Sequence, residues 1–120
     1  MLDLSHKNLD VYKFSLLLLK EVYILTKTFP KAEIYVLTYQ MRRSSISICS
    51  NIAEGASRKS SIEKKRFFEI ARGSAVELDT QIEISISLDY VNKDQIVKLQ
   101  ALLESVFRML SKMIDNLAPK

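Results

Sequence analysis

The sequence predicts an all-α protein that folds as a single antiparallel, up-down-up-down four-helix bundle over residues 1–120. The chain is 48% hydrophobic but has only two glycines and two prolines, and turn-rich β folds need many more of both. Its apolar residues recur at helical spacing in four segments that short connections separate. Short connections place consecutive helices beside each other in opposite directions. At this length, one domain can bury a sufficient core.

The first helix is expected from about Asn8 to Thr28. Its apolar residues cover more than half of its circumference, which predicts burial on two sides, either in a bundle or at an interface. Pro30 ends this helix, because proline disfavours the helical conformation in the residue before it.

The central helix is expected between Thr38, a candidate N-cap, and Gly55, a candidate left-handed C-terminal residue. Its apolar stripe follows 4-3-4 spacing and consists of Met41, Ser45, Ile48 and Ile52. The same helix carries charged and amide groups that a plain surface helix does not need. These groups are Arg42, Arg43, Asn51 and Glu54.

The third helix is expected from about Ser61 to Leu88, after a capping box of Ser60 and Glu63. Its predicted seam is Phe67, Ile70 or Ala71, Ser74, Leu78, Gln81 or Ile82, Ser85 and Leu88. The seam contains small residues that should let a neighbouring helix approach closely. They are Ala71, Gly73, Ser74 and Ala75, and a mid-helix glycine otherwise costs up to about 1 kcal/mol.

The fourth helix follows a second capping box, formed by Asn92 and Gln95. Its apolar residues step 3-4-3-4-3-4 and form a heptad seam of Ile96, Leu99, Leu103, Val106, Leu110, Met113 and Leu117. Residues 119–120 form a short tail.

Composition and motifs argue against several classes of protein. The chain shows no secretory signal and no apolar run of the roughly 20 residues that a membrane helix needs. It has one histidine, one cysteine and no Glu-x-x-His motif, so di-iron and zinc sites are not expected. We therefore expect no enzyme activity, metal or cofactor. Cys49 is interpreted as a small core residue, and the compartment as a reducing cytosol.

Charge is divided along the chain between residues 58 and 92. The first part, to Arg72, has six basic residues against Glu63 and Glu69, whereas residues 73–92 have four acids and no base. The candidate nucleic-acid-binding residues are Arg58, Lys59, Lys64, Lys65, Arg66 and Arg72. One interpretation is a phosphate-binding patch. The other is a solvated face with the intrahelical pairs Glu63–Arg66 and Glu69–Arg72.

A second group of polar residues is expected to fix the register of the helices. This candidate structural network is Arg42, Arg43, Asn51, Glu54, Glu77 and Gln81. In an antiparallel pair, Arg42 or Arg43 should approach Glu77 or Asp79, and Glu54 should approach Arg66 or its neighbours. The alternative for Asn51 and Glu54 is local bonding to backbone in the last turns of their helix.

These residues resemble the signature of the four-helix bundle proteins related to the 23S rRNA intervening-sequence protein. The matching motifs are Arg42-Arg43, Ser47-Ile48, Ser50-Asn-Ile-Ala-Glu-Gly55, Phe67, Ile70-Ala71, Gly73-Ser74, Glu77-Leu78 and Gln81. The resemblance extends over about residues 12–91. Two departures are Cys49, where the family often has proline, and Asp89, where glycine commonly precedes the tyrosine. The first is expected to leave the helix straighter, and the second to change the turn before the fourth helix.

The resemblance implies a bacterial cytosolic protein that assembles as a ring-like homopentamer. A related branch is the accessory variability protein of diversity-generating retroelements, which binds a reverse transcriptase and nucleic acid through a basic surface. Our leading hypothesis is a non-enzymatic oligomer that binds RNA or DNA weakly. The alternative is an interaction scaffold with a protein partner, for example a reverse transcriptase, and no direct role in nucleic-acid binding.

Overall fold

In a computed structural model, which describes residues 1–117, the protein is all-α, with no strand in that range. The predicted tail at residues 119–120 lies outside the described part. The four long helices are α1 (Asp10–Thr26), α2 (Leu37–Ser57), α3 (Ser61–Ser87) and α4 (Val97–Asn116). Three short 3-10 helices are η1 (Ser5–Asn8), η2 (Lys31–Glu33) and η3 (Lys93–Ile96).

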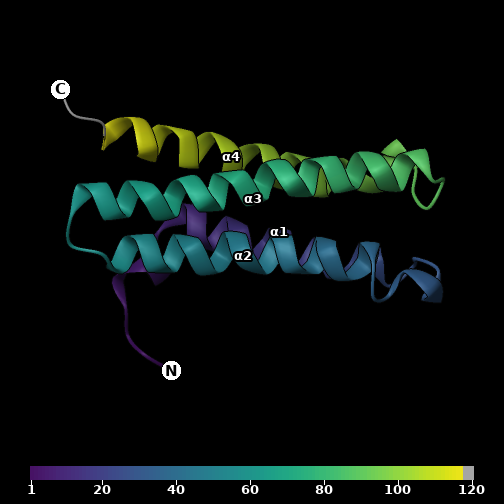
Figure 1. Cartoon of the computed structure of the whole chain (residues 1–120), viewed down its shortest axis with the longest axis horizontal. Coiled ribbons are helices and arrows are strands. Elements are labelled where there is room, and N and C mark those ends of the chain that lie inside the picture. The colour runs from purple at the N-terminus through teal and green to yellow at the C-terminus, as the bar shows by residue number, and fades with distance from the viewer. Residues whose placement is uncertain (118–120) are drawn as a thin grey trace.

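The four helices lie side by side along the long axis of a molecule that measures 45 × 33 × 22 Å (Figure 1). Helices α1 and α2 form the lower layer in this view, and α3 and α4 form the upper layer. Helix α1 packs mainly against α2 and α4, and α3 packs mainly against the same two helices. The α2–α3 connection lies at one end of the molecule, and the α3–α4 connection at the other.

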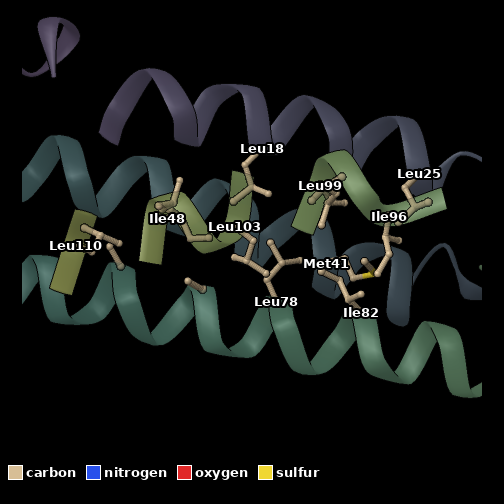
Figure 2. Close-up of a cluster of buried hydrophobic side chains, with 14 of the residues drawn as sticks. Leu18, Leu25, Met41, Ile48, Leu78, Ile82, Ile96, Leu99, Leu103 and Leu110 are labelled. Atoms are coloured by element: carbon tan, nitrogen blue, oxygen red, sulfur yellow. The ribbon is translucent and has the colours of Figure 1, made fainter. Parts of the chain in front are cut away.

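One continuous apolar core joins all four helices. Figure 2 shows Leu18 of α1, Met41 and Ile48 of α2, Leu78 of α3 and Leu110 of α4 pointing into it. All five side chains are fully buried. Burial of this kind stabilises the fold by about 1.5–3 kcal/mol per large aliphatic side chain.

The predicted heptad seam is confirmed from Ile96, which ends η3, to Leu110 of α4, and all five predicted residues in this range are buried. At the C-terminal end of the seam, Ile114 is buried in place of the predicted Met113, which is only partly buried. The shift follows from the geometry of a straight helix, whose 3.6-residue turn drifts away from a strict seven-residue repeat.

Two expectations for the ends of α2 are wrong. Helix α2 begins at Leu37 after Val36, with no side-chain cap, and Thr38 is buried inside the first turn. Gly55 does not end the helix, because α2 continues to Ser57 and no glycine among residues 1–117 has a positive φ. Gly55 is instead buried against α3. The fold thus depends on the small size of Gly55 and not on the ability of glycine to adopt a positive φ.

Helix α3 begins as predicted, since the Ser60 side chain accepts a hydrogen bond from the Glu63 amide at 3.1 Å. Its seam is displaced at both ends: Phe68 is buried in place of Phe67, and Leu88 is exposed. The middle of the seam is confirmed by the buried residues Ala71, Ser74, Ala75, Leu78, Ile82 and Ser85. Gly73 is exposed, and a Cβ added there would meet nothing within 4 Å in this chain, so the expected close approach of a neighbouring helix at Gly73 is wrong within one chain.

The turn after α3 is a Schellman motif with aspartate in the position that usually takes glycine. Asp89 has a φ of 61°, and its amide bonds to the carbonyl of Ile86 at 3.0 Å. The Tyr90 amide reaches back to the Ser85 carbonyl, also at 3.0 Å. The Asn92–Gln95 capping box is confirmed in both directions, although it caps η3, which precedes α4.

The wide apolar face of α1 is only partly covered within the chain. Val11, Leu18, Val22 and Leu25 are buried, but Leu16, Leu17 and Ile24 are exposed.

Candidate nucleic-acid interface

The net positive charge of the protein is concentrated at one end of the bundle. Residues 58–72 contain six bases and two acids, a net charge of +4, which equals that of the whole chain. The remaining bases and acids therefore balance. This segment comprises the α2–α3 connection and the first turns of α3, at the end of the molecule where α4 also ends (Figure 1). We call the six bases, Arg58, Lys59, Lys64, Lys65, Arg66 and Arg72, the basic end.

Arg58 is held in place by two contacts with its neighbours. Its guanidinium donates to Glu54 Oε2 at 3.0 Å and lies over the Phe67 ring, 4.8 Å from the centroid. About half of each side chain of the ion pair is exposed, so solvent screens it and its contribution to stability is a few tenths of a kcal/mol. Glu54 thus pairs within α2 and its C-terminal flank, and among residues 1–117 it forms no ion pair with Arg66 or the neighbours of Arg66.

Lys64 caps the C-terminal end of α2. Its ammonium donates to the Ala56 carbonyl at 3.0 Å and to the Gly55 carbonyl at 3.5 Å. These carbonyls belong to the last turn of the helix, where a cation also interacts favourably with the helix dipole. Lys64 therefore joins α3 to the end of α2.

Arg72 is also bonded inside the chain, because its Nη1 donates to the Ser111 hydroxyl of α4 at 3.3 Å. The expected Glu69–Arg72 pair is absent among residues 1–117. The Glu63–Arg66 pair is absent from the same range.

Lys59, Lys65 and Arg66 are the remaining members of the basic end. Within residues 1–117 the structure gives none of them a side-chain hydrogen bond or ion pair. Lys65 and Arg66 line an open depression of about 910 Å³ between the start of α3 and the end of α4. Ser61, Glu69 and Asn116 contribute polar groups to it. Three members of the basic end are thus engaged in contacts within the fold, and the other three have no bonding partner in this range.

The polar residues of α2 do not form one network. Arg42 Nε donates to the Thr26 hydroxyl at 3.0 Å, and its guanidinium lies 4.5 Å from the centroid of the Tyr23 ring. Both partners belong to α1, so Arg42 joins α2 to α1. The expected ion pair with Glu77 or Asp79 is not formed by either arginine among the described residues.

A separate hydroxyl bridge joins α2 to α3. The hydroxyls of Ser47 and Ser74 bond at 2.8 Å, and the Asn51 amide donates to the Ser47 carbonyl and hydroxyl at 2.9 and 3.1 Å. Arg43 and Glu77 line a small groove beside this bridge. Gln81 lies further along α3, and its Oε1 is buried with no bonding partner in residues 1–117. The sequence does not predict the Ser47–Ser74 hydrogen bond, although both serines belong to the motifs that carry the family resemblance.

Cys49 is buried in α2. Burial raises the pKa of its thiol, and a hydrogen bond with Ser15 opposes the shift in part. Among residues 1–117 no three His, Cys, Asp or Glu side chains lie close enough together to hold a metal ion. None of the described helices combines the length and the apolar character that crossing a membrane requires.

The family model for the 23S rRNA-intervening sequence protein matches residues 7–112. A similar solved structure is that of a protein with unknown function from the S23 ribosomal protein family of Bacteroides thetaiotaomicron. The two folds superpose with a TM-score of 0.78 over 88% of this chain and 95% of that chain, at 23% sequence identity. At this identity the likeness establishes a shared fold. No curated protein matches the chain.

Proposed function

The chain belongs to the 23S rRNA-intervening sequence protein family, and from this premise we propose that it is a non-enzymatic, oligomeric bundle that binds RNA or DNA weakly through its basic end. The observation that carries the proposal is that the entire net charge of +4 lies in residues 58–72. Lys59, Lys65 and Arg66 have no partner in the described chain, so their charges are free for phosphates.

Phosphate recognition fits the chemistry of this surface better than base recognition. Ammonium and guanidinium groups neutralise backbone phosphates and release counterions, which gives an affinity that falls with salt. Base stacking needs exposed aromatic rings beside the cations. The nearest ring, Phe67, is only partly exposed and already stacks against Arg58. The expected binding is therefore weak and tolerant of sequence.

Assembly would strengthen such a patch, because several copies on one particle bind one strand with avidity. The resemblance of the motifs implies a ring-like homopentamer in the bacterial cytosol, and this is the assembly that we propose. The exposed apolar residues Leu16, Leu17 and Ile24 of α1 support an interface between chains.

The proposal also takes the bundle to be antiparallel, in up-down-up-down order. Contacts between α2 and α3 support this order. Met41 is bonded to Ser85, Ser47 to Ser74, and Gly55 packs on Phe68. Residues later in α2 thus meet residues earlier in α3.

The experiment that tests this function combines light scattering with an RNA titration. Light scattering before and after nuclease treatment reports the number of subunits and any nucleic acid that co-purifies. Fluorescence anisotropy of a labelled, structured RNA then measures affinity at several salt concentrations. We expect an oligomer whose affinity falls as salt rises. An absence of binding, or binding that salt does not change, contradicts the proposal.

A second candidate function is a scaffold for a protein partner. The observation in its favour is that Arg58, Lys64 and Arg72 are engaged in contacts within the chain, which leaves three free bases per subunit. A pull-down that recovers a protein partner, and no nuclease-sensitive material, supports the scaffold over the nucleic-acid binder.

A further inference from the structure

Two grooves on opposite sides of the bundle carry opposite charge. The first lies between α1 and α2 and is called the α1/α2 groove; the second lies between α3 and α4 and is called the α3/α4 groove. Since α1 and α2 form one layer and α3 and α4 the other (Figure 1), the two grooves face away from each other. Their volumes are similar, about 280 and 260 Å³.

The α1/α2 groove is apolar with a basic rim. Its exposed apolar residues are Ile34, Tyr39 and Ile46, and its charged residues are Arg42 and Arg43, with no acid in the lining. Arg42 is fixed by Thr26 and Tyr23. Arg43 is exposed and has no ion-pair partner within residues 1–117. The groove therefore presents an unsatisfied cation beside apolar surface.

The α3/α4 groove has the same apolar character with the opposite charge. Val76 and Phe107 both line it and are 53% and 41% exposed. Asp79 and Glu104 are its charged residues, and its lining contains no base. Neither acid has an ion-pair partner among the described residues.

We propose that the α1/α2 groove of one copy binds the α3/α4 groove of a second copy. The two surfaces are complementary in charge, because each groove supplies exposed apolar side chains together with charges that the other groove can pair. Apolar contact gives affinity, and the arginine–carboxylate pairs fix register and orientation. This inference rests on the oligomeric assembly proposed above and assigns its two contact faces.

The arrangement has a geometric consequence. The contact joins two different surfaces, so it is heterologous, and each copy keeps one groove free for the next copy. Such contacts close into a ring when the rotation between neighbours allows it. The basic end lies at an end of the bundle and lines neither groove, so it remains accessible in the assembly.

The test uses two variants, each with one blocked groove. Ile46→Asp places an acid in the α1/α2 groove, and Val76→Glu adds an acid to the α3/α4 groove. Both native residues are about half exposed, so the bundle core is unchanged. Each nuclease-treated variant alone should scatter light as a monomer of 13.8 kDa. Mixed together, they should form a particle of twice that mass, because each supplies the intact groove that the other lacks.

Ile84→Glu is the matched control. Ile84 is an isoleucine of α3 with 43% exposure that lines neither groove, so its substitution should leave the wild-type mass unchanged. A wild-type protein that is monomeric contradicts the assembly itself. A wild-type oligomer that both variants leave intact contradicts only the assignment of faces. If both variants are monomeric but do not form a dimer when they are mixed, the assignment is also wrong, because each variant keeps the groove that the other lacks.

Discussion

Gly55 of α2 lies so close to Phe68 of α3 that a Cβ on the glycine would be 2.7 Å from the Cε1 atom of the ring. Real Cβ atoms do not approach a ring carbon so closely, and Phe68 is itself 3% exposed, so the ring has little room to move. Glycine is thus the residue that lets the two helices approach at the basic end. The Lys64 bond to the Ala56 carbonyl, at 3.0 Å, lies next to this contact.

Gly55→Ala should destabilise the protein, because the added methyl group forces the ring or the helix to move. Overpacking of this kind costs about 1–3 kcal/mol. That exceeds the gain of up to about 1 kcal/mol that alanine brings to a helix interior. Urea denaturation followed by circular dichroism measures the difference. Equal or greater stability of the variant would show that the contact is not tight.

Gly73→Ala should have the opposite effect. Gly73 is exposed on α3, and an added Cβ would meet nothing within 4 Å in this chain. Alanine should therefore raise the free energy of unfolding by about 0.5–1 kcal/mol. The same denaturation experiment on monomeric protein tests this. A loss of stability would contradict the open space that the structure leaves around Gly73.

Asp89→Gly should stabilise the turn between α3 and η3. Asp89 has a φ of 61°, and this left-handed conformation costs an L-residue about 1–2 kcal/mol, less for aspartate than for most. Glycine removes that cost but has a larger entropy when unfolded, so we expect a net gain of about 0.5 kcal/mol. Asp89→Ala is the comparison and should lose stability. If thermal melts show that Asp89→Ala is as stable as Asp89→Gly or more stable, residue 89 does not have the left-handed conformation.

Cys49 should make stability decline at alkaline pH. Its pKa is raised by burial, so the folded thiol stays protonated where the unfolded thiol ionises, above its ordinary pKa of about 8.5. In that window the unfolded state binds fewer protons, and the free energy of unfolding falls as pH rises. Cys49→Ala lacks this effect. The free energy of unfolding of the wild type minus that of the variant should decrease from neutral to alkaline pH. A difference that stays constant over this range contradicts the prediction.

The elements of the fold could be predicted because their signals are local. The seam from Ile96 to Leu110 depends only on spacing, and the Asn92–Gln95 box only on two side chains three residues apart. The end of α2 could not be predicted in the same way. Glycine serves both as a left-handed cap and as a close-contact residue. Only the position of Phe68 in three dimensions distinguishes the two roles for Gly55.

The basic end shows the same limit for the candidate site. Its charge is visible in the sequence, but the partners of its members are not, because they lie on different helices. Arg72 bonds to Ser111, 39 residues away, and Lys64 binds backbone carbonyls, which no side-chain pattern reveals. Likewise Arg42 stacks on Tyr23 of α1, whereas charge alone predicts that it approaches the acidic residues of α3.

The contacts within the basic end determine at which residues the charge should be reversed in a test of nucleic-acid binding. Lys64→Glu would remove the cap of α2 and place an acid beside its carbonyls, so reduced binding by that variant is ambiguous. Lys59, Lys65 and Arg66 have no such role in the described chain. Charge reversal at two exposed lysines outside the basic end, Lys31→Glu with Lys93→Glu, supplies a control. These lysines begin η2 and η3, the segments just before α2 and α4, which lie at the opposite end of the bundle (Figure 1).

The most direct test is the salt dependence of RNA affinity for wild type, for Lys59→Glu/Lys65→Glu/Arg66→Glu, and for the Lys31→Glu/Lys93→Glu control. Each phosphate that the protein no longer neutralises should lower the slope of log K against log salt by about one. We predict a large decrease in affinity and a flatter slope for the triple variant, with unchanged thermal stability, and a much smaller change for the control. Equal slopes for wild type and triple variant, or equal decreases in triple variant and control, would contradict the assignment of the basic end as the nucleic-acid interface.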